Sequence, residues 1–211
     1  SPLLRSVPGI YHAFLGKDPV AGRNRRERLR EVFSLSADVV GKLKQVHPAT
    51  VLRYGTGDGD APGGWKREGD ALWTDKTGTG VGVHTADCVP ILLAHRRFPL
   101  AAAVHAGWRG LGGGIVDETV SSVARNYGNA AATGLVAAVG PGARGCCYEV
   151  GEETADALAS VPGGAGQIRK GREPGKWMAD LPEIVLSALS AAGGPGRSAE
   201  AVGPGTVCSP R

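Results

Sequence analysis

Runs of consecutive apolar residues divide this chain into strand-sized pieces. Residues 89–94 and, apart from His105, residues 100–106 are apolar, which is typical of strands buried on both faces of a sheet. Residues 135–139 form a third run that ends at Gly140-Pro141. Weaker strand candidates lie at residues 10–15, 70–74 and 80–84, with a turn at 76–78 and an extended stretch at 45–54.

Four segments carry helical patterns. One is expected from residue 18 to about residue 33, with its arginines facing water. Another covers residues 115–125, where two acidic residues in the first turn suit the helix dipole. Residues 149–159 and 178–192 are the remaining candidates. Strands and helices mix without regular alternation, so the pattern predicts a single α+β domain over residues 1–211 rather than a doubly wound sheet.

Glycine is the most informative feature of the composition, with 34 residues among 211 and 14 prolines beside them. The glycines follow no fixed period, so they indicate tight turns and surface loops rather than a low-complexity chain. The loops are expected at residues 55–69, 107–114 and 161–176.

Charge and cysteine content argue against several classes of partner. The net charge is only +4, and five arginines between residues 23 and 30 are best explained as the solvated face of a helix. Aromatic residues make up 5%, too few for a platform that stacks nucleic-acid bases. No apolar run is long enough for a signal peptide or a membrane span. Four scattered cysteines do not form a secreted disulfide framework. We expect a soluble, reduced, cytoplasmic protein without a nucleic-acid or membrane partner, and the sequence leaves its oligomeric state open.

Cys88 and His105 are the first candidates for chemistry. Each lies at the end of a predicted buried strand, beside a turn or a glycine-rich loop, and a hairpin would bring them together across 17 residues. A thiolate and an imidazole in contact either bind a metal or form a nucleophile with its base. His47 is the best third ligand, held in an extended turn by the proline after it. Two histidines and a cysteine leave one tetrahedral position open, as in catalytic zinc sites.

Plainer explanations exist for the same residues. A strand histidine is often only hydrogen-bonded, and a buried cysteine often only packs. His84 shares a strand face with Cys88 and is either a further ligand or a neighbour of the site. The glycine loop before the helix at residue 115 offers free amides and Arg109 to an anion, or it simply makes a tight turn. At the corner near residue 146, we expect Cys146 to line a pocket and Cys147 to pack.

Four segments together resemble the YfiH-like laccase-domain family, also named purine nucleoside phosphorylase or polyphenol oxidase. They are Asp70-Ala-Leu-Trp-Thr-Asp75, Thr85-Ala-Asp-Cys-Val-Pro-Ile-Leu-Leu93, Ala103-Val-His-Ala-Gly-Trp-Arg-Gly-Leu111 and Cys146-Cys-Tyr-Glu-Val-Gly-Glu152, and Gln45-Val-His47 looks like a fifth motif. The resemblance covers residues 10 to 160 well. It implies a mixed β-sandwich flanked by helices, in αββα layers, and a zinc ion on His47, Cys88 and His105.

The same resemblance implies activity on small substrates. The family's activities are phosphorolysis of adenosine, guanosine, inosine and methylthioadenosine, and deamination of adenosine. In this reading Cys88, His105, Asp87 and Arg109 are catalytic. Asp87 would orient water or move protons, and Arg109 would hold phosphate. Substrate binding is assigned to Gln45, Arg109, Gly110, Gly112 and Cys146. The chain departs from the family pattern because it lacks the GGVS and SLN segments and has His84 where an aliphatic residue is usual. Its C-terminal residues 206–211 also form a shorter tail than the family pattern has.

Two rival functions remain open at this point. A copper-binding polyphenol oxidase would use the same His and Cys ligands, although five histidines are few for a multicopper centre. A metal-free amidase acting on a peptidoglycan precursor would use Cys88 as nucleophile and His105 as base.

Overall fold

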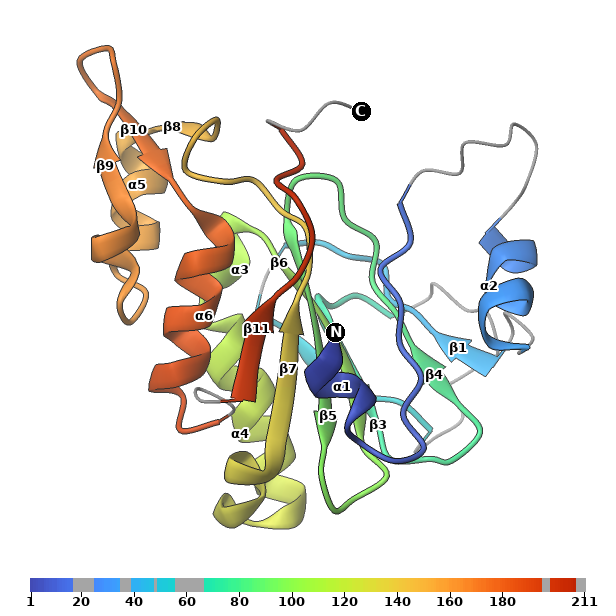
Figure 1. The fold of residues 1–211 in the computed structure, drawn as a ribbon. Coiled ribbons are helices and arrows are strands. Elements are labelled where there is room, and N and C mark those ends of the chain that lie inside the picture. The colour runs from blue at the N-terminus through green and yellow to red at the C-terminus, as the bar shows by residue number, and fades with distance from the viewer. Residues whose placement is uncertain (17–24, 35–38, 48, 56–66, 195–197, 208–211) are drawn as a thin grey trace.

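A six-stranded sheet forms the centre of the protein (Figure 1). The computed structural model describes residues 1–16, 25–34, 39–47, 49–55, 67–194 and 198–207. The strand order is β11-β7-β5-β6-β3-β2, with parallel pairs at the two edges and antiparallel pairs between them. The strands are β2 (Val51–Arg53), β3 (Ala71–Thr74), β5 (Val89–His95), β6 (Ala101–Ala106), β7 (Leu135–Val139) and β11 (Ala199–Ala201).

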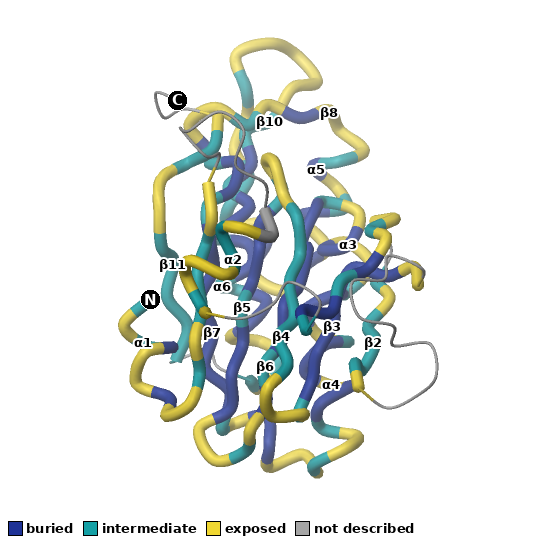
Figure 2. The backbone as a smooth tube through the Cα atoms, turned by 90° about the vertical axis from the view of Figure 1, so that its right-hand side faces the viewer, coloured by how far each residue is buried: buried dark blue, intermediate teal, exposed yellow. Residues whose placement is uncertain are grey.

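The two most apolar runs of the sequence form the middle of this sheet. β5 and β6 are buried along almost their whole length (Figure 2), because both faces of the sheet are covered. They pair as an antiparallel hairpin with Val89 opposite Ala106 and Pro90 opposite His105. The expected strands and the expected hairpin are therefore confirmed.

Helices cover one face of the sheet and enclose the larger core. α4 (Ile115–Tyr127) and α6 (Leu181–Ala191) lie along the strands, and α3 (Trp108–Gly112) and α5 (Glu152–Ala159) lie nearer one end (Figure 1). The buried side of α4 includes Ile115, Thr119 and Val123, which follow the spacing of one helix face. The 3₁₀ turns η2 (Asn129–Gly134) and η3 (Gly164–Gln167) connect these elements.

The N-terminal segment covers the opposite face and overturns one expectation. α1 (Pro2–Arg5) places Leu4 against Ala94 and Val136 of the sheet in a second, smaller apolar cluster. Residues 10–15 were expected to be a strand, but they belong to no strand. Ile10 and Phe14 pack against this cluster instead, so burial of side chains rather than a hydrogen-bonded ladder holds the segment.

Two small sheets account for most other differences from the expected elements. β1 (Val40–Gly41) pairs in parallel with β4 (Gly80–Val81), so the segment at 80–84 does not form a hairpin with β3. β8 (Glu149–Gly151), β10 (Lys176–Ala179) and β9 (Ile168–Lys170) form an antiparallel sheet beside α5. The helices expected at 149–159 and 178–192 therefore begin later, after short strands, and the expected loop at 161–176 contains η3 and β9.

The general class is nevertheless as expected, an α+β fold with mixed sheets and flanking helices. The helix predicted from residue 18 is present as α2 (Arg25–Phe33), while residues 18–24 and most of the expected loop at 55–69 lie outside the described residues. Of the expected extended stretch at 45–54, only β2 is a strand. Within the described part of the chain, every helix is too short or too polar to cross a bilayer.

Candidate metal centre

The β5–β6 hairpin brings Cys88 and His105 together. Cys88 immediately precedes β5, and His105 is the second-last residue of β6, opposite Pro90. The register therefore sets Cys88 beside the residue that follows β6, which is Gly107. His105 is buried and Cys88 is half-buried, so the pair lies at the edge of the core rather than in free solvent.

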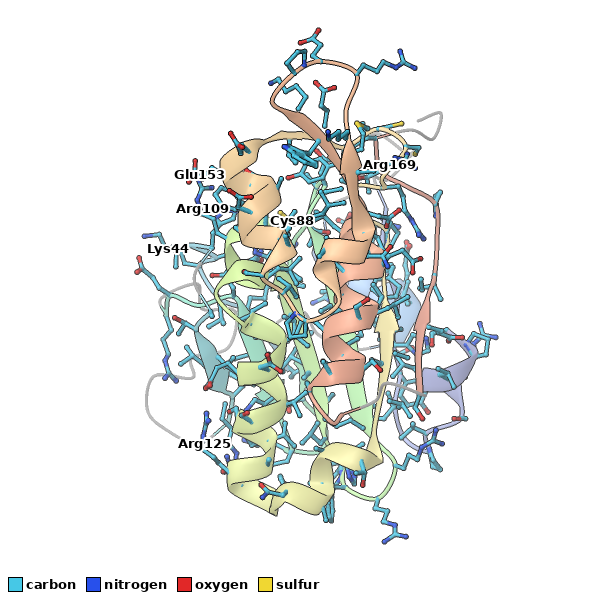
Figure 3. All side chains as sticks on the ribbon, turned by 90° about the vertical axis from the view of Figure 1, so that its left-hand side faces the viewer. Lys44, Cys88, Arg109, Arg125, Glu153 and Arg169 are labelled. Atoms are coloured by element: carbon cyan, nitrogen blue, oxygen red, sulfur yellow. The ribbon has the colours of Figure 1, made fainter. Side chains whose placement is uncertain are left out.

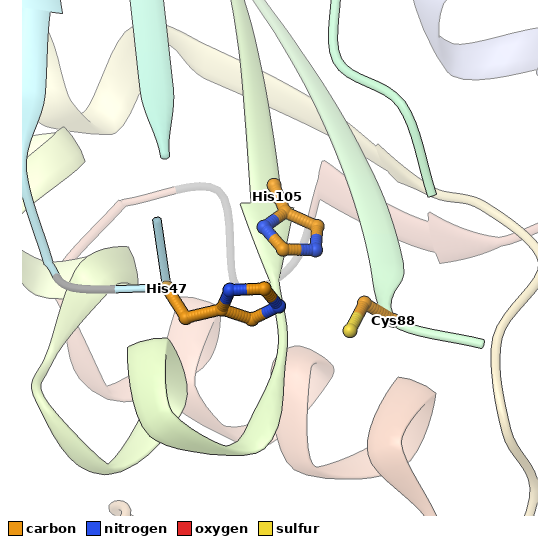
Figure 4. Close-up of side chains that lie close together, drawn as sticks. All are labelled: His47, Cys88 and His105. Atoms are coloured by element: carbon orange, nitrogen blue, oxygen red, sulfur yellow. The ribbon is translucent and has the colours of Figure 1, made fainter. Parts of the chain in front are cut away.

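His47 completes the cluster from a different part of the chain (Figure 4). One potential ligand atom from each of His47, Cys88 and His105 lies within 4.8 Å of the other two. The two imidazole rings meet edge to face with centroids 5.0 Å apart. The expected convergence of these three side chains is confirmed. The expected extended backbone at His47 is wrong, because its φ is +69°, in the left-handed region that non-glycine residues seldom adopt.

A buried carboxylate fixes the orientation of His105. Asp70 is fully buried, and its Oδ1 lies 2.6 Å from His105 Nδ1. This leaves Nε2 as the ring nitrogen available to a metal. A carboxylate on the far nitrogen is the usual outer partner of a metal-binding histidine, because it fixes the tautomer and makes the ligand more basic. Asp70 lies in one of the sequence motifs, but nothing in the sequence marked it as a site residue.

The donor set suits a borderline or soft cation. Two imidazoles and one thiolate are ligands that zinc and copper prefer. Two bonds of about 2.0–2.3 Å to one ion place their ligand atoms roughly 4 Å apart, and the ligand atoms here lie within 4.8 Å of one another. Burial, Asp87 and Asp70 raise the pKa of the Cys88 thiol in the metal-free protein. A cation between the three side chains would favour the thiolate and offset this effect.

Gly107 leaves the space that the cluster needs. A Cβ atom at this position would lie 2.9 Å from Cys88 Sγ and 3.7 Å from His47 Cδ2. Gly107 also precedes α3, a five-residue helix, where the sequence predicted an irregular glycine loop. Packing explains two further glycines of this segment, since Gly110 is buried against Ile115 and a Cβ at Gly112 would meet Ala157 of α5 at 3.3 Å.

If the cluster binds a cation such as zinc, replacing Gly107 with alanine is expected to weaken that binding at least tenfold, a loss in the range caused by disturbing a metal's outer shell. The added methyl group would displace Cys88 Sγ, while the backbone, with φ of −87°, accepts alanine. Competition with a chromogenic chelator measures the affinity. Gly166→Ala is the matched control, because a Cβ there meets nothing within 4 Å. Equal zinc affinity in both variants would contradict the proposed position of the metal.

Polar groups surround the cluster on its exposed side. Asp87 accepts a hydrogen bond of 2.9 Å from the Thr206 hydroxyl, which arrives from the C-terminal part of the chain. Burial, together with Cys88 and Asp87, raises the pKa of Tyr148, while Arg109 acts in the opposite direction. Tyr148 therefore lies within electrostatic reach of these three residues. Tyr148 lies in the motif at residues 146–152, but nothing in the sequence predicted a role for it.

Arg109 is exposed, and its guanidinium carbon lies 4.2 Å from the centre of the Trp108 ring. Figure 3 shows Arg109 and Cys88 in the same half of the molecule, beside α5. Arg109 and Cys88 both influence the pKa of Tyr148, and phosphate binding by Arg109 stays a prediction.

The structure places the other predicted site residues differently. The Gln45 side chain is hydrogen-bonded to the backbone of His84, and neither residue belongs to the described ligand cluster. Cys146 and Cys147 are exposed and disulfide-bonded. The expectation that Cys147 packs is therefore wrong, and the disulfide bonding also contradicts the expectation of a reduced protein. Cys146 also lies outside the ligand cluster of the described residues, and its assignment to substrate binding stays a prediction.

Comparisons with known proteins identify the family of the chain. The family model described as multi-copper polyphenol oxidoreductase laccase matches residues 12–211. A purine nucleoside phosphorylase of Clostridium acetobutylicum is 40% identical over 63% of this chain and 52% of its own length. The purine nucleoside phosphorylase YfiH of Escherichia coli K12 is 36% identical over 86% of this chain and 70% of its own length.

Solved structures share the fold. The crystal structure of Bacillus licheniformis hypothetical protein YfiH aligns with a TM-score of 0.78 at 24% identity, covering 86% of this chain and 69% of that one. The chain spans about half to two thirds of the length of the first curated relatives, 52% and 65%. With its fold, its motifs and the family model in agreement, the chain belongs to the laccase-like polyphenol oxidoreductase family that includes the YfiH proteins.

Proposed function

We propose that this chain is a purine nucleoside phosphorylase that depends on one zinc ion held by His47, Cys88 and His105. The observation that carries the proposal is the convergence of these three side chains from distant segments onto one point. The names of the relatives support the reaction. The open coordination position that three protein ligands leave to zinc supports a catalytic rather than a structural ion.

When bound, zinc would supply a fixed positive charge that polarises or binds an oxygen of a reactant. The chain's own groups perform the remaining tasks. Arg109 binds the phosphate anion, since a guanidinium pairs well with phosphate oxygens. A phosphate oxygen then forms a bond to C1′ of the ribose, and the bond from C1′ to N9 of the purine breaks with its electron pair leaving on the base.

The departing base needs a proton or a hydrogen bond. Tyr148 is a nearby group whose hydroxyl can donate that hydrogen bond, while Asp87 would orient water or move protons. Burial, Cys88 and Asp87 raise the pKa of Tyr148, so its phenol stays protonated at neutral pH and can donate a hydrogen bond. The substrates proposed are adenosine, guanosine, inosine and methylthioadenosine, and deamination of adenosine is proposed as a side activity of the same centre.

The proposal is tested by turnover of inosine, adenosine and methylthioadenosine, with and without phosphate, by protein stripped of metal and reloaded with zinc. We expect release of free base that requires both phosphate and zinc. Ammonia released from adenosine without phosphate would report the deaminase activity separately. If the zinc-loaded protein turns over none of these nucleosides, the proposed function is overturned.

One observation favours a second function. Asp70, His105 and Cys88 follow one another in the order of an acid–base–nucleophile triad, which a metal-free hydrolase would use. Against it, burial and two carboxylates raise the pKa of Cys88, whereas a nucleophilic cysteine needs a lowered pKa, and His47 would have no task. If zinc protects Cys88 from an alkylating reagent, the metal centre is supported. If Cys88 is alkylated rapidly in the presence of zinc and activity is lost, the hydrolase is supported.

Copper is the alternative metal, because the family description names it. The same ligands accept copper, but the five histidines of this chain are few for several copper ions. Metal analysis of protein purified without added metal separates the two. One zinc per chain supports the proposal, and stoichiometric copper with oxidation of phenols would reverse it.

A further inference from the structure

The backbone of the segment that carries His47 pairs with the chain around Glu68 at Lys44, three residues before the ligand. His47 is exposed, and its φ of +69° costs energy that the surrounding structure must offset. A ligand on such a segment reaches its place only if other contacts restrain the segment. Two side chains supply these contacts, and each of them connects His47 to another ligand.

The first of these side chains is Asp70. Its Oδ1 lies 2.6 Å from His105 Nδ1, and its Oδ2 accepts a hydrogen bond of 3.2 Å from the backbone N–H of Val46. The backbone carbonyl of Asp70 also accepts the N–H of His105 at 2.7 Å. One buried carboxylate thus restrains the ring of one ligand and the residue before the other. Buried charge-assisted hydrogen bonds of this kind are the stronger class in proteins.

The second side chain is Gln45. Its Nε2 donates to the carbonyl oxygen of His84 at 2.7 Å, and its Oε1 accepts the N–H of His84 at 2.8 Å. The amide therefore pairs with a peptide group as one strand pairs with the next. His84 lies in the segment that leads to Cys88, four residues later. Gln45 thereby connects the His47 segment to the Cys88 segment.

We propose that Asp70 and Gln45 are positioning residues that hold the three ligands together before the metal binds. Asp70 connects His47 to His105, and Gln45 connects His47 to the approach to Cys88. This inference rests on the proposed metal centre and gives Gln45 a task at that centre in place of the substrate binding suggested by its motif. Preorganised ligands bind tighter because less freedom is lost when the ion arrives.

The test measures Zn²⁺ affinity of the metal-free full chain by chelator competition. Asp70→Asn keeps an oxygen for His105 but offers an NH₂ group that cannot accept from Val46. Gln45→Met keeps the length of the side chain and removes both hydrogen bonds. We expect each variant to bind zinc 10- to 100-fold more weakly than the unaltered chain, the range found for outer-shell partners.

Two matched controls separate positioning from general stability. Asp75 lies just after the other end of β3 and accepts hydrogen bonds from Arg53 and Tyr127, so Asp75→Asn disturbs the same strand away from the ligands. Lys44→Met removes only the exposed ion pair with Glu68 beside Gln45. Both controls are expected to keep zinc affinity within twofold, although Asp75→Asn lowers the melting temperature of the metal-free protein.

The possible results are distinguishable. If the unaltered chain binds no zinc, the proposed function fails and this inference fails with it. If the unaltered chain binds zinc and Asp70→Asn and Gln45→Met bind it equally well, only the positioning roles are overturned. A raised KM for the nucleoside in Gln45→Met with unchanged zinc affinity would return Gln45 to substrate binding.

Discussion

Replacing Cys88 with alanine is expected to abolish zinc binding and nucleoside phosphorolysis together. Cys88 supplies the only sulfur of the described ligand cluster, and without it two imidazoles remain, one of them on an exposed segment. The affinity should fall by more than about a hundredfold, beyond the loss caused by removing an outer-shell partner. Metal per chain after dialysis and release of base from inosine are the two measurements.

Thr85→Ala is the matched control for this change, because Thr85 is exposed in the same segment and three residues before the ligand. It should keep both zinc and activity. The account would be contradicted by Cys88→Ala protein that retains one zinc per chain. It would equally be contradicted by a variant that loses zinc and keeps full activity.

The second large effect is expected at the other end of β5, where His95 is buried. Its Nδ1 accepts the backbone N–H groups of Arg97 and Phe98, both at 3.1 Å, and its ring stacks on Phe98 at 4.3 Å. Burial lowers the pKa of His95, so the ring is held neutral as an acceptor. Gly134 lies against this ring, and a Cβ there would be 2.1 Å from His95 Nε2.

Gly134→Ala is therefore expected to reduce the free energy of unfolding by about 2–4 kcal/mol. Overpacking costs about 1–3 kcal/mol, and a displaced buried hydrogen-bonding group adds a similar amount. Urea denaturation of the metal-free protein measures the change. Zinc affinity of the folded variant should stay within twofold, because the ligands lie at the opposite end of the strand.

A double-mutant cycle identifies the cause of this loss. In a His95→Ala background the ring is absent, so Gly134→Ala should cost much less than it does in the natural background. The same cost in both backgrounds would show that the clash with His95 is not responsible.

The parts of the fold that the sequence predicted well are those in which local pattern and tertiary packing agree. The apolar runs of β5, β6 and β7 admit few alternatives to buried strands, and α4 has both its apolar face and its acidic first turn. Because β5 and β6 are adjacent antiparallel strands, the approach of Cys88 to His105 followed from sequence order alone.

The wrong predictions share a different cause. The glycines of α3 have low helix propensity, yet contact with α5 and the core stabilises a short helix there. β8 and β9 are three-residue strands that exist only because β10 lies between them. Such segments carry too little pattern to be recognised, since tertiary contacts decide their conformation.

Within the candidate site, the ligands could be predicted and their partners could not. His47, Cys88 and His105 belong to residue types that bind metals, so each was a candidate ligand from the sequence alone. Asp70 and Gln45 are common polar residues whose tasks depend on hydrogen bonds to segments far away in the chain. No periodicity or spacing in one sequence reports such contacts.

The central claim is that one ion binds His47, Cys88 and His105 together, and anomalous diffraction at the zinc edge tests it most directly. Crystals of the protein purified with zinc should show a single strong peak bonded to Cys88 Sγ and to one ring nitrogen of each histidine. A map with no peak between these side chains, or with zinc bound elsewhere while the three remain apart, would contradict the account.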